Sequence, residues 1–144
     1  MNRKTVIKEG EYGQAMVLTA VFITFMVAFL LSFSIDMTRM MMVRNDLHEA
    51  VDSGCQAAAQ AINMPLYKNT GRLQVDLGTG SGWALREFNA SVVESGIVQY
   101  TPRITGMTLQ SPTIVACTAS ADVNRLVPAT PSITVRVFTT SETR

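Results

Sequence analysis

The sequence contains few of the residues on which catalysis and metal binding depend. One histidine, two cysteines and one tryptophan occur among 144 residues, and no group of cysteines and histidines has the spacing of a zinc site. The histidine, His48, stands beside Glu49 on what reads as the polar face of a helix, and Ser53 lies on a different side. No catalytic triad is therefore expected. We expect no enzyme, no catalytic residue, no metal ion and no cofactor.

No feature of the sequence favours a partner that carries phosphate groups. The net charge is +1, without the basic face that nucleic acid requires and without a polybasic patch for anionic lipids. The run from Leu73 to Gly82 superficially resembles a phosphate-binding loop, but its glycines are spaced GxGxG rather than GxGxxG. We expect a flexible loop there and no nucleic-acid partner.

The segment Ala15–Ile35 lacks charge, proline and glycine altogether. At about 1.5 Å per residue its 21 residues form a helix about 31 Å long, close to the ~30 Å hydrocarbon core of a bilayer. Its hydroxyl groups are expected to bond to carbonyl oxygens one turn earlier, so that they cost little in lipid. A buried core helix is the alternative, but the rest of this short chain could not enclose it and also form its own core. The segment is therefore predicted to be a transmembrane helix in contact with lipid.

The residues beside this segment predict its orientation. Residues 1–14 form a polar head with Arg3, Lys4 and Lys8, which the positive-inside rule places in the cytoplasm. We expect a single-pass protein with its N-terminus inside and its C-terminus outside. Cleavage at Ser34, in the small-x-small triplet that ends there, is an alternative that would release a secreted domain. The apolar segment is longer than that of a usual signal peptide, which favours the anchored form.

Residues 36–62 are predicted to continue the same helix with two faces. Apolar and small residues recur every three or four positions, and most charged and amide side chains lie off this stripe. The stripe comprises Met40, Val43, Leu47, Val51, Gly54, Ala58 and Ala61. Because no proline occurs before Pro65, we expect one helix over residues 15–62. Its small residues suit close packing against a sheet or a neighbouring helix.

The remaining residues, 63–144, are predicted to form a small extracytoplasmic α+β domain. Residues 63–82 read as loop, with a short strand at 72–77, and a short helix is expected at 83–94. The side chains expected to face inward from that helix are Trp83, Leu85, Phe88 and Val92.

Beyond this helix the apolar period changes to two, which predicts an antiparallel sheet. The expected strands are residues 97–104, 113–123 and 133–139. The predicted fold class is thus α+β: a long N-terminal transmembrane helix continues into an amphipathic helix that packs on a small antiparallel sheet.

Two pairs of residues are candidates for specific interactions. Cys55 and Cys117 are both expected to face inward, so they form either a disulfide outside the cytoplasm or two buried thiols. Asp36 and Arg39, three positions apart, lie at the predicted outer membrane boundary. They either form an ion pair, interfacial or between subunits, or simply mark where the lipid ends.

The N-terminal half resembles the TadE/TadG-like proteins of Flp (tight-adherence) pilus assembly. The residues that carry the resemblance are Gly13-Gln14-Ala15, the apolar segment, Asp36-Met37-Thr38-Arg39, and the run from Leu47 to Ala58, LHEAVDSGCQAA. Residues 10–62 resemble the family well. The C-terminal third does so loosely, through Val127-Pro128 and a last strand that starts at Ser132.

This resemblance implies a pilin-like structural role in a bacterial inner membrane. The chain would be a minor pilin or pseudopilin of a tight-adherence pilus, with other pilus subunits, or further copies of itself in a filament, as partners. Gly10 and Gly13 become candidate processing sites, although neither is followed five residues later by the Glu of classical prepilins. The alternative function is that of a membrane-anchored binding or regulatory protein.

Overall fold

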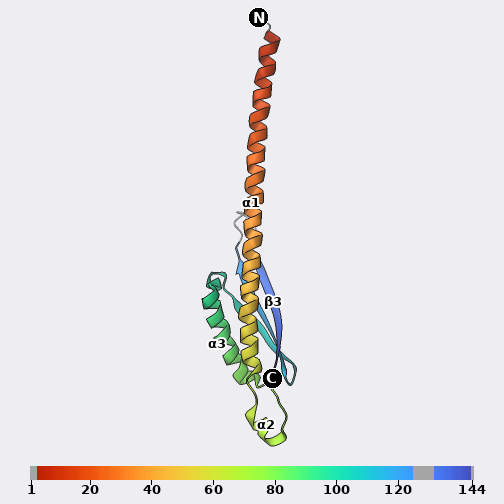
Figure 1. Ribbon diagram of the computed structural model, residues 1–144, viewed down its shortest axis with the longest axis vertical. Coiled ribbons are helices and arrows are strands. Elements are labelled where there is room, and N and C mark those ends of the chain that lie inside the picture. Colours follow the sequence, from red (N-terminus) through yellow and green to blue (C-terminus); the bar gives the residue numbers. More distant parts are fainter. Residues whose placement is uncertain (1–2, 125–131, 144) are drawn as a thin grey trace. The chain divides into compact units, whose positions relative to one another are not determined.

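The structure is a computed structural model that describes residues 3–124 and 132–143, and the side chains of these from residue 13 onward. Its helices are α1 (Arg3–Ala59), α2 (Met64–Thr70), α3 (Leu77–Ser95) and the 3₁₀ helix η1 (Ile97–Tyr100). Its strands are β1 (Arg103–Ser111), β2 (Ile114–Val123) and β3 (Ile133–Glu142) (Figure 1). The predicted α+β class is confirmed. The chain divides into two compact units, residues 1–37 and 38–144.

The first unit is the apolar part of α1. Helix formation follows from a long run without proline or glycine, and its hydroxyl groups bond within the helix as expected. Thr19 and Thr24 donate to the carbonyl oxygens of Ala15 and Ala20 at 2.8 and 2.9 Å, and Ser32 donates to that of Ala28 at 3.0 Å. The polar hydrogens of these three hydroxyl groups are therefore satisfied within the helix.

α1 begins twelve residues before Ala15 and ends at Ala59 rather than at Ile62. The end comes earlier than predicted because Ile62 forms an isolated antiparallel bridge with Val75. Asn63, beyond the end of α1, caps the next helix, since its side chain accepts from the Leu66 amide at 3.0 Å.

In the second unit, residues 38–59 of α1 and the helix α3 pack on one face of the sheet (Figure 1). On α1 the predicted stripe is buried from Val43 to Ala58, Met40 is half-buried, and Cys55 and Ala59 extend the stripe toward the sheet. The largest fully buried side chains of the core are Leu47, Val51, Cys55, Phe88, Val115 and Cys117. The second unit therefore has a hydrophobic core of its own.

The loop predicted before residue 83 is wrong, because α3 already begins at Leu77. Asp76 caps the helix, and its carboxylate accepts from the Gly78 amide at 3.0 Å and from the Thr79 hydroxyl at 2.9 Å. These two hydrogen bonds, the one from Thr79 first, hold the pKa of Asp76 below its ordinary value of 3.8. A short helix, α2, also replaces part of the predicted loop.

Two glycines, Gly80 on α3 and Gly54 on α1, allow the two helices to pack closely. A Cβ on Gly80 would lie 2.9 Å from the Ala58 carbonyl oxygen, and one on Gly54 would lie 2.9 Å from that of Ala84. The buried face of α3 consequently follows a spacing of four, through Gly80, Ala84, Phe88 and Val92. Phe88 and Val92 face inward as predicted. Trp83 and Leu85 do not, because they lie off this face and are 48% and 49% exposed.

The sheet is a three-stranded antiparallel meander in the order β1-β2-β3, as predicted. The first predicted strand was wrong in position: Ile97–Tyr100 forms η1, and Thr101 takes a left-handed conformation with φ of 45° before β1 begins. β1 also runs past the predicted end at Ile104 to Ser111, and Gly106 lies inside it beside a register irregularity. The C-terminal pair Val127-Pro128 lies outside the described residues.

The two faces of the sheet differ as the alternation predicted. On β2, the side chains of Val115, Cys117, Ala119, Ala121 and Val123 are all buried toward the helices. On β3, Val137 is buried and Thr134 and Arg136 are exposed. The outer face carries the ion pair Arg103–Asp122 at 3.9 Å and the half-exposed ring of Phe138.

Candidate functional site

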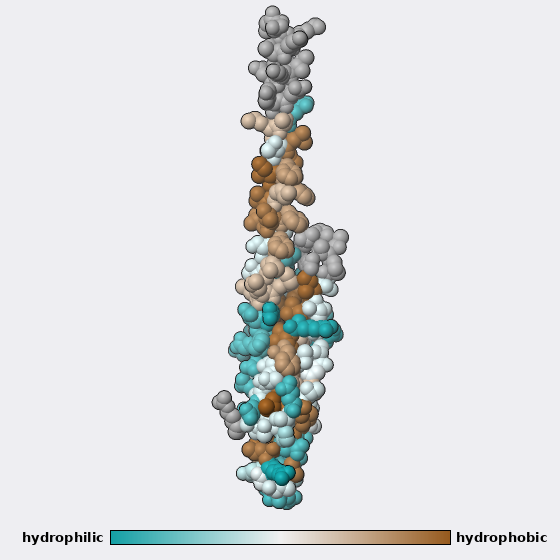
Figure 2. Space-filling model, turned by 90° about the vertical axis from the view of Figure 1, so that its right-hand side faces the viewer, coloured by the Kyte–Doolittle hydropathy of each residue, from teal (hydrophilic) through white to brown (hydrophobic). Residues whose placement is uncertain are grey.

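The apolar segment, residues 15–35 of α1, is the most unusual surface of the first unit. Its large apolar side chains point in all directions, and none of those from Met16 to Ile35 is buried. Exposed fractions reach 77% at Met16 and 72% at Phe25. In Figure 2 brown and tan residues cover most of the visible face of the helix below the grey N-terminal residues, with a few paler ones among them. A soluble protein rarely leaves so large an apolar surface in water, which points to lipid or to neighbouring helices as its surroundings.

α1 is the one helix within the described residues that is long and apolar enough to cross a membrane. This is consistent with membrane anchoring. The candidate processing sites both lie within α1, where Gly13 has open space around it and Gly10 belongs to the part of which only the backbone is described.

Asp36 and Arg39 lie just beyond the apolar segment. Asp36 is 7% exposed, and Arg39 is half-buried. The Arg39 guanidinium donates to the Tyr100 hydroxyl at 3.3 Å, a contact that joins α1 to η1. Arg39 therefore holds together two elements of the second unit that are 61 residues apart in sequence.

Cys55 and Cys117 meet where α1 lies on the central strand of the sheet. Their Cα atoms are 5.8 Å apart, and the structure joins their sulfur atoms in a disulfide. Both side chains are fully buried. The bond would link the helix to β2 across the middle of the core.

Further polar contacts join α1 to its neighbours in the second unit. The Asp52 carboxylate accepts from the Thr139 hydroxyl at 3.0 Å, and the Ser53 and Ser91 hydroxyls are 2.9 Å apart. The Thr143 hydroxyl donates to the Ala59 carbonyl oxygen at the end of α1, at 2.6 Å. These groups position the elements of the second unit relative to α1.

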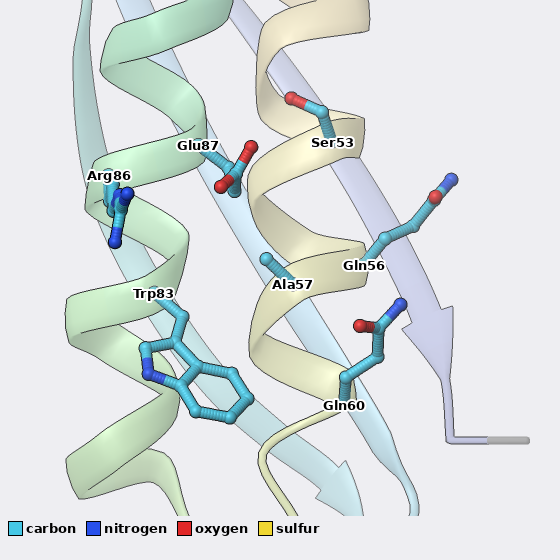
Figure 3. A pocket seen from close by; sticks show the side chains of 7 residues that line it. All are labelled: Ser53, Gln56, Ala57, Gln60, Trp83, Arg86 and Glu87. Carbon is cyan, nitrogen blue, oxygen red and sulfur yellow. The ribbon is translucent and has the colours of Figure 1, made fainter.

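A hollow of about 440 Å³ opens between α1 and α3 (Figure 3). Its lining is mostly polar and includes the single tryptophan of the chain. The lining residues are Ser53, Gln56, Ala57, Gln60, Trp83, Arg86 and Glu87. Sequence reasoning missed this hollow because it placed Trp83 in the core. The spacing of four from Gly80 through Ala84 and Phe88 to Val92 would have indicated that Trp83 lies off the buried face of the helix.

The described residues contain no group of three His, Cys, Asp or Glu side chains placed to hold a metal ion. His48 is exposed on α1, as expected. The geometry thus offers surfaces for binding and packing.

The matched part of the chain coincides with the apolar segment and its amphipathic continuation. Residues 13–61 match the family model of putative Flp pilus-assembly TadE/G-like proteins. This Tad domain confirms the resemblance over about one third of the chain, and it supports involvement in Flp pilus assembly with other pilus components as partners. The family suggests a structural, non-enzymatic role. No curated protein and no solved structure matches the chain.

Proposed function

We propose that this protein is a minor pilin or pseudopilin of a Flp-type (tight-adherence) pilus, held by helix packing in the bacterial inner membrane or in the filament. The observation that carries the proposal is the apolar segment, exposed on every side within a Tad domain. An apolar helix leaves lipid at low cost only where neighbouring helices replace the lipid. One surface thus serves for storage in the membrane and for assembly.

The proposed orientation has the N-terminus in the cytoplasm and residues 38–144 outside. The Lys and Arg residues of the head support it, and so does the Cys55–Cys117 pair, because disulfides persist in oxidising compartments. A C-terminal alkaline phosphatase fusion should be active in cells. An inactive fusion would refute the orientation.

The test of the pilus role is to shear surface filaments from cells and to detect the chain in them by mass spectrometry. We expect the wild-type chain in the filaments and the Phe25→Arg variant absent from them, because an arginine at the centre of the apolar segment costs about 2.5–3.5 kcal/mol in a membrane. The matched control is Phe138→Arg, since Phe138 is also more than half exposed but lies on the sheet. A wild-type chain that stays in the membrane and never enters filaments would instead favour an anchored binding or regulatory protein.

Asp36 and Arg39 are proposed as an intersubunit or interfacial pair. Co-expression separates the two cases: Asp36→Arg and Arg39→Asp chains should each assemble poorly alone and together restore assembly if the pair forms between chains. Absence of rescue would exclude an intersubunit pair.

A further inference from the structure

The side chains that line the hollow between α1 and α3 take no part in the packing of the apolar segment that we propose above. Its apolar parts are the indole of Trp83, 48% exposed, and the methyl group of Ala57 opposite it. Figure 3 shows the indole and the Glu87 carboxylate extending from α3 toward the space between the helices, with Gln56 and Gln60 on α1. The small side chain of Ala57 leaves room in front of the ring.

The polar side chains of this hollow are largely without partners. Within the described part of the chain, the side chains of Gln60, Trp83, Arg86 and Glu87 make no hydrogen bond and no ion pair. By contrast, Ser53 is paired with Ser91, and Gln56 donates to Asp52 at 3.0 Å. Hydrogen-bond donors and acceptors thus line the same hollow as the indole.

The charges of the hollow select among ligands. Arg86 and Glu87 cancel each other, so the hollow has no excess charge to attract a phosphate or a carboxylate. A nucleotide would stack on an indole but requires a basic groove. A helix from another protein would bury the amides and charged groups without hydrogen bonds, which is costly.

We propose that this hollow binds a neutral sugar ring stacked on Trp83. A sugar presents an apolar face of C–H groups to an aromatic ring, and hydroxyl groups at its edge that both donate and accept. Gln60 and Glu87 are placed to take those hydroxyls, and the volume is in the range of small-molecule sites. The site lies within residues 38–144 and does not depend on the pilus role.

Because Trp83 is the only tryptophan of the chain, its fluorescence reports on this hollow directly. The experiment titrates the full chain, in an amine-oxide detergent without sugar headgroups, with glucose, galactose, N-acetylglucosamine and their disaccharides. We expect a saturable change in fluorescence for at least one of them, with a Kd of about 1 mM or tighter, as one stacked ring with a few hydrogen bonds gives. No saturable change with any of these sugars would overturn the proposal.

Three variants test the assignment of residues. Gln60→Ala retains the fluorophore and should weaken binding about fivefold or more, which is about the loss of one hydrogen bond. Trp83→Ala should abolish binding measured by isothermal titration calorimetry. The matched control is Leu85→Ala, because Leu85 is on the same helix and equally exposed but does not line the hollow.

Circular dichroism of each variant establishes that it is folded. Unchanged affinity in folded Gln60→Ala and Trp83→Ala chains, or an equal loss in Leu85→Ala, would place any sugar binding elsewhere and refute the site.

Discussion

At the scale of single residues, two glycines set how closely the helices of the second unit approach. Gly54 on α1 and Gly80 on α3 each face a backbone carbonyl of the other helix, and a Cβ at either position would lie 2.9 Å from that oxygen. Backbone atoms cannot move aside as a flexible side chain does, so the helices would have to separate.

We predict that Gly80→Ala destabilises the protein by about 1–3 kcal/mol, as overpacking of a well-packed core does. The control is Gly82→Ala in the same helix, where a Cβ meets nothing within 4 Å. Alanine favours the helix there and should stabilise by up to about 1 kcal/mol. Thermal unfolding of the full chain in detergent measures both. If Gly82→Ala destabilises the protein as much as Gly80→Ala does, or if Gly80→Ala does not destabilise it, the packing argument is wrong.

Asp76 provides a prediction about pH. Its folded-state pKa is lowered, first by the Thr79 hydroxyl and then by the Gly78 amide, so its contribution to stability is fully present above the ordinary value of 3.8. That contribution is lost as the pH falls through the lower folded-state pKa. Asp76→Asn cannot titrate, and its unfolding midpoint should approach that of the wild type as the pH is lowered below 3.8. If the unfolding midpoints of the two chains differ by the same amount at all pH values, titration of Asp76 does not contribute to stability.

At the scale of elements, the Cys55–Cys117 bond joins α1 to β2 across 62 residues of sequence. Closing a loop of that length stabilises by about 4 kcal/mol in the chain-entropy account. We therefore predict that dithiothreitol lowers the unfolding midpoint of the wild type and leaves a chain with Cys55→Ala and Cys117→Ala unchanged. If alkylation of the denatured, unreduced chain detects free thiols, the disulfide does not form.

The elements also show what the sequence could and could not reveal. Three features could be predicted because each depends on local composition or periodicity: the apolar helix, the stripe from Val43 to Ala61, and the alternation of β2. The start of α3 was not, since the glycines 78, 80 and 82 indicate a loop unless it is known that Ala58 lies against Gly80. The first strand was misplaced because Ile97–Tyr100 is as β-branched and apolar as a strand. The left-handed residue Thr101, which separates η1 from β1, has no signature of its own.

At the scale of the whole molecule, the two compact units differ in what each requires of its surroundings. Residues 38–144 enclose a core, whereas the apolar segment of α1 buries none of its large side chains. The end of the apolar segment could be located in the sequence, because the first charge, Asp36, directly follows the last apolar residue, Ile35. It could not predict the hollow at Trp83, which depends on how two helices meet.

We predict that a chain beginning at Thr38 is monomeric in water without detergent, because it lacks the apolar segment and keeps the core. The full-length chain should require detergent. Sedimentation velocity of both preparations measures this. Aggregation of the shorter chain, or a soluble full-length monomer, would show that the apolar segment does not determine solubility.

The contact between Thr143 and the carbonyl oxygen of Ala59 has a consequence for biosynthesis. Translation proceeds from the N-terminus, so β3 and Thr143, which bonds to the end of α1, are made after α1, α3, β1 and β2. Until Val137 and Thr139 have been synthesised, the side of the core that β3 covers is exposed, and Asp52 on α1 lacks its partner on that strand. A chain that lacks β3 would therefore leave this side of the core exposed, and we expect quality-control proteases to remove it.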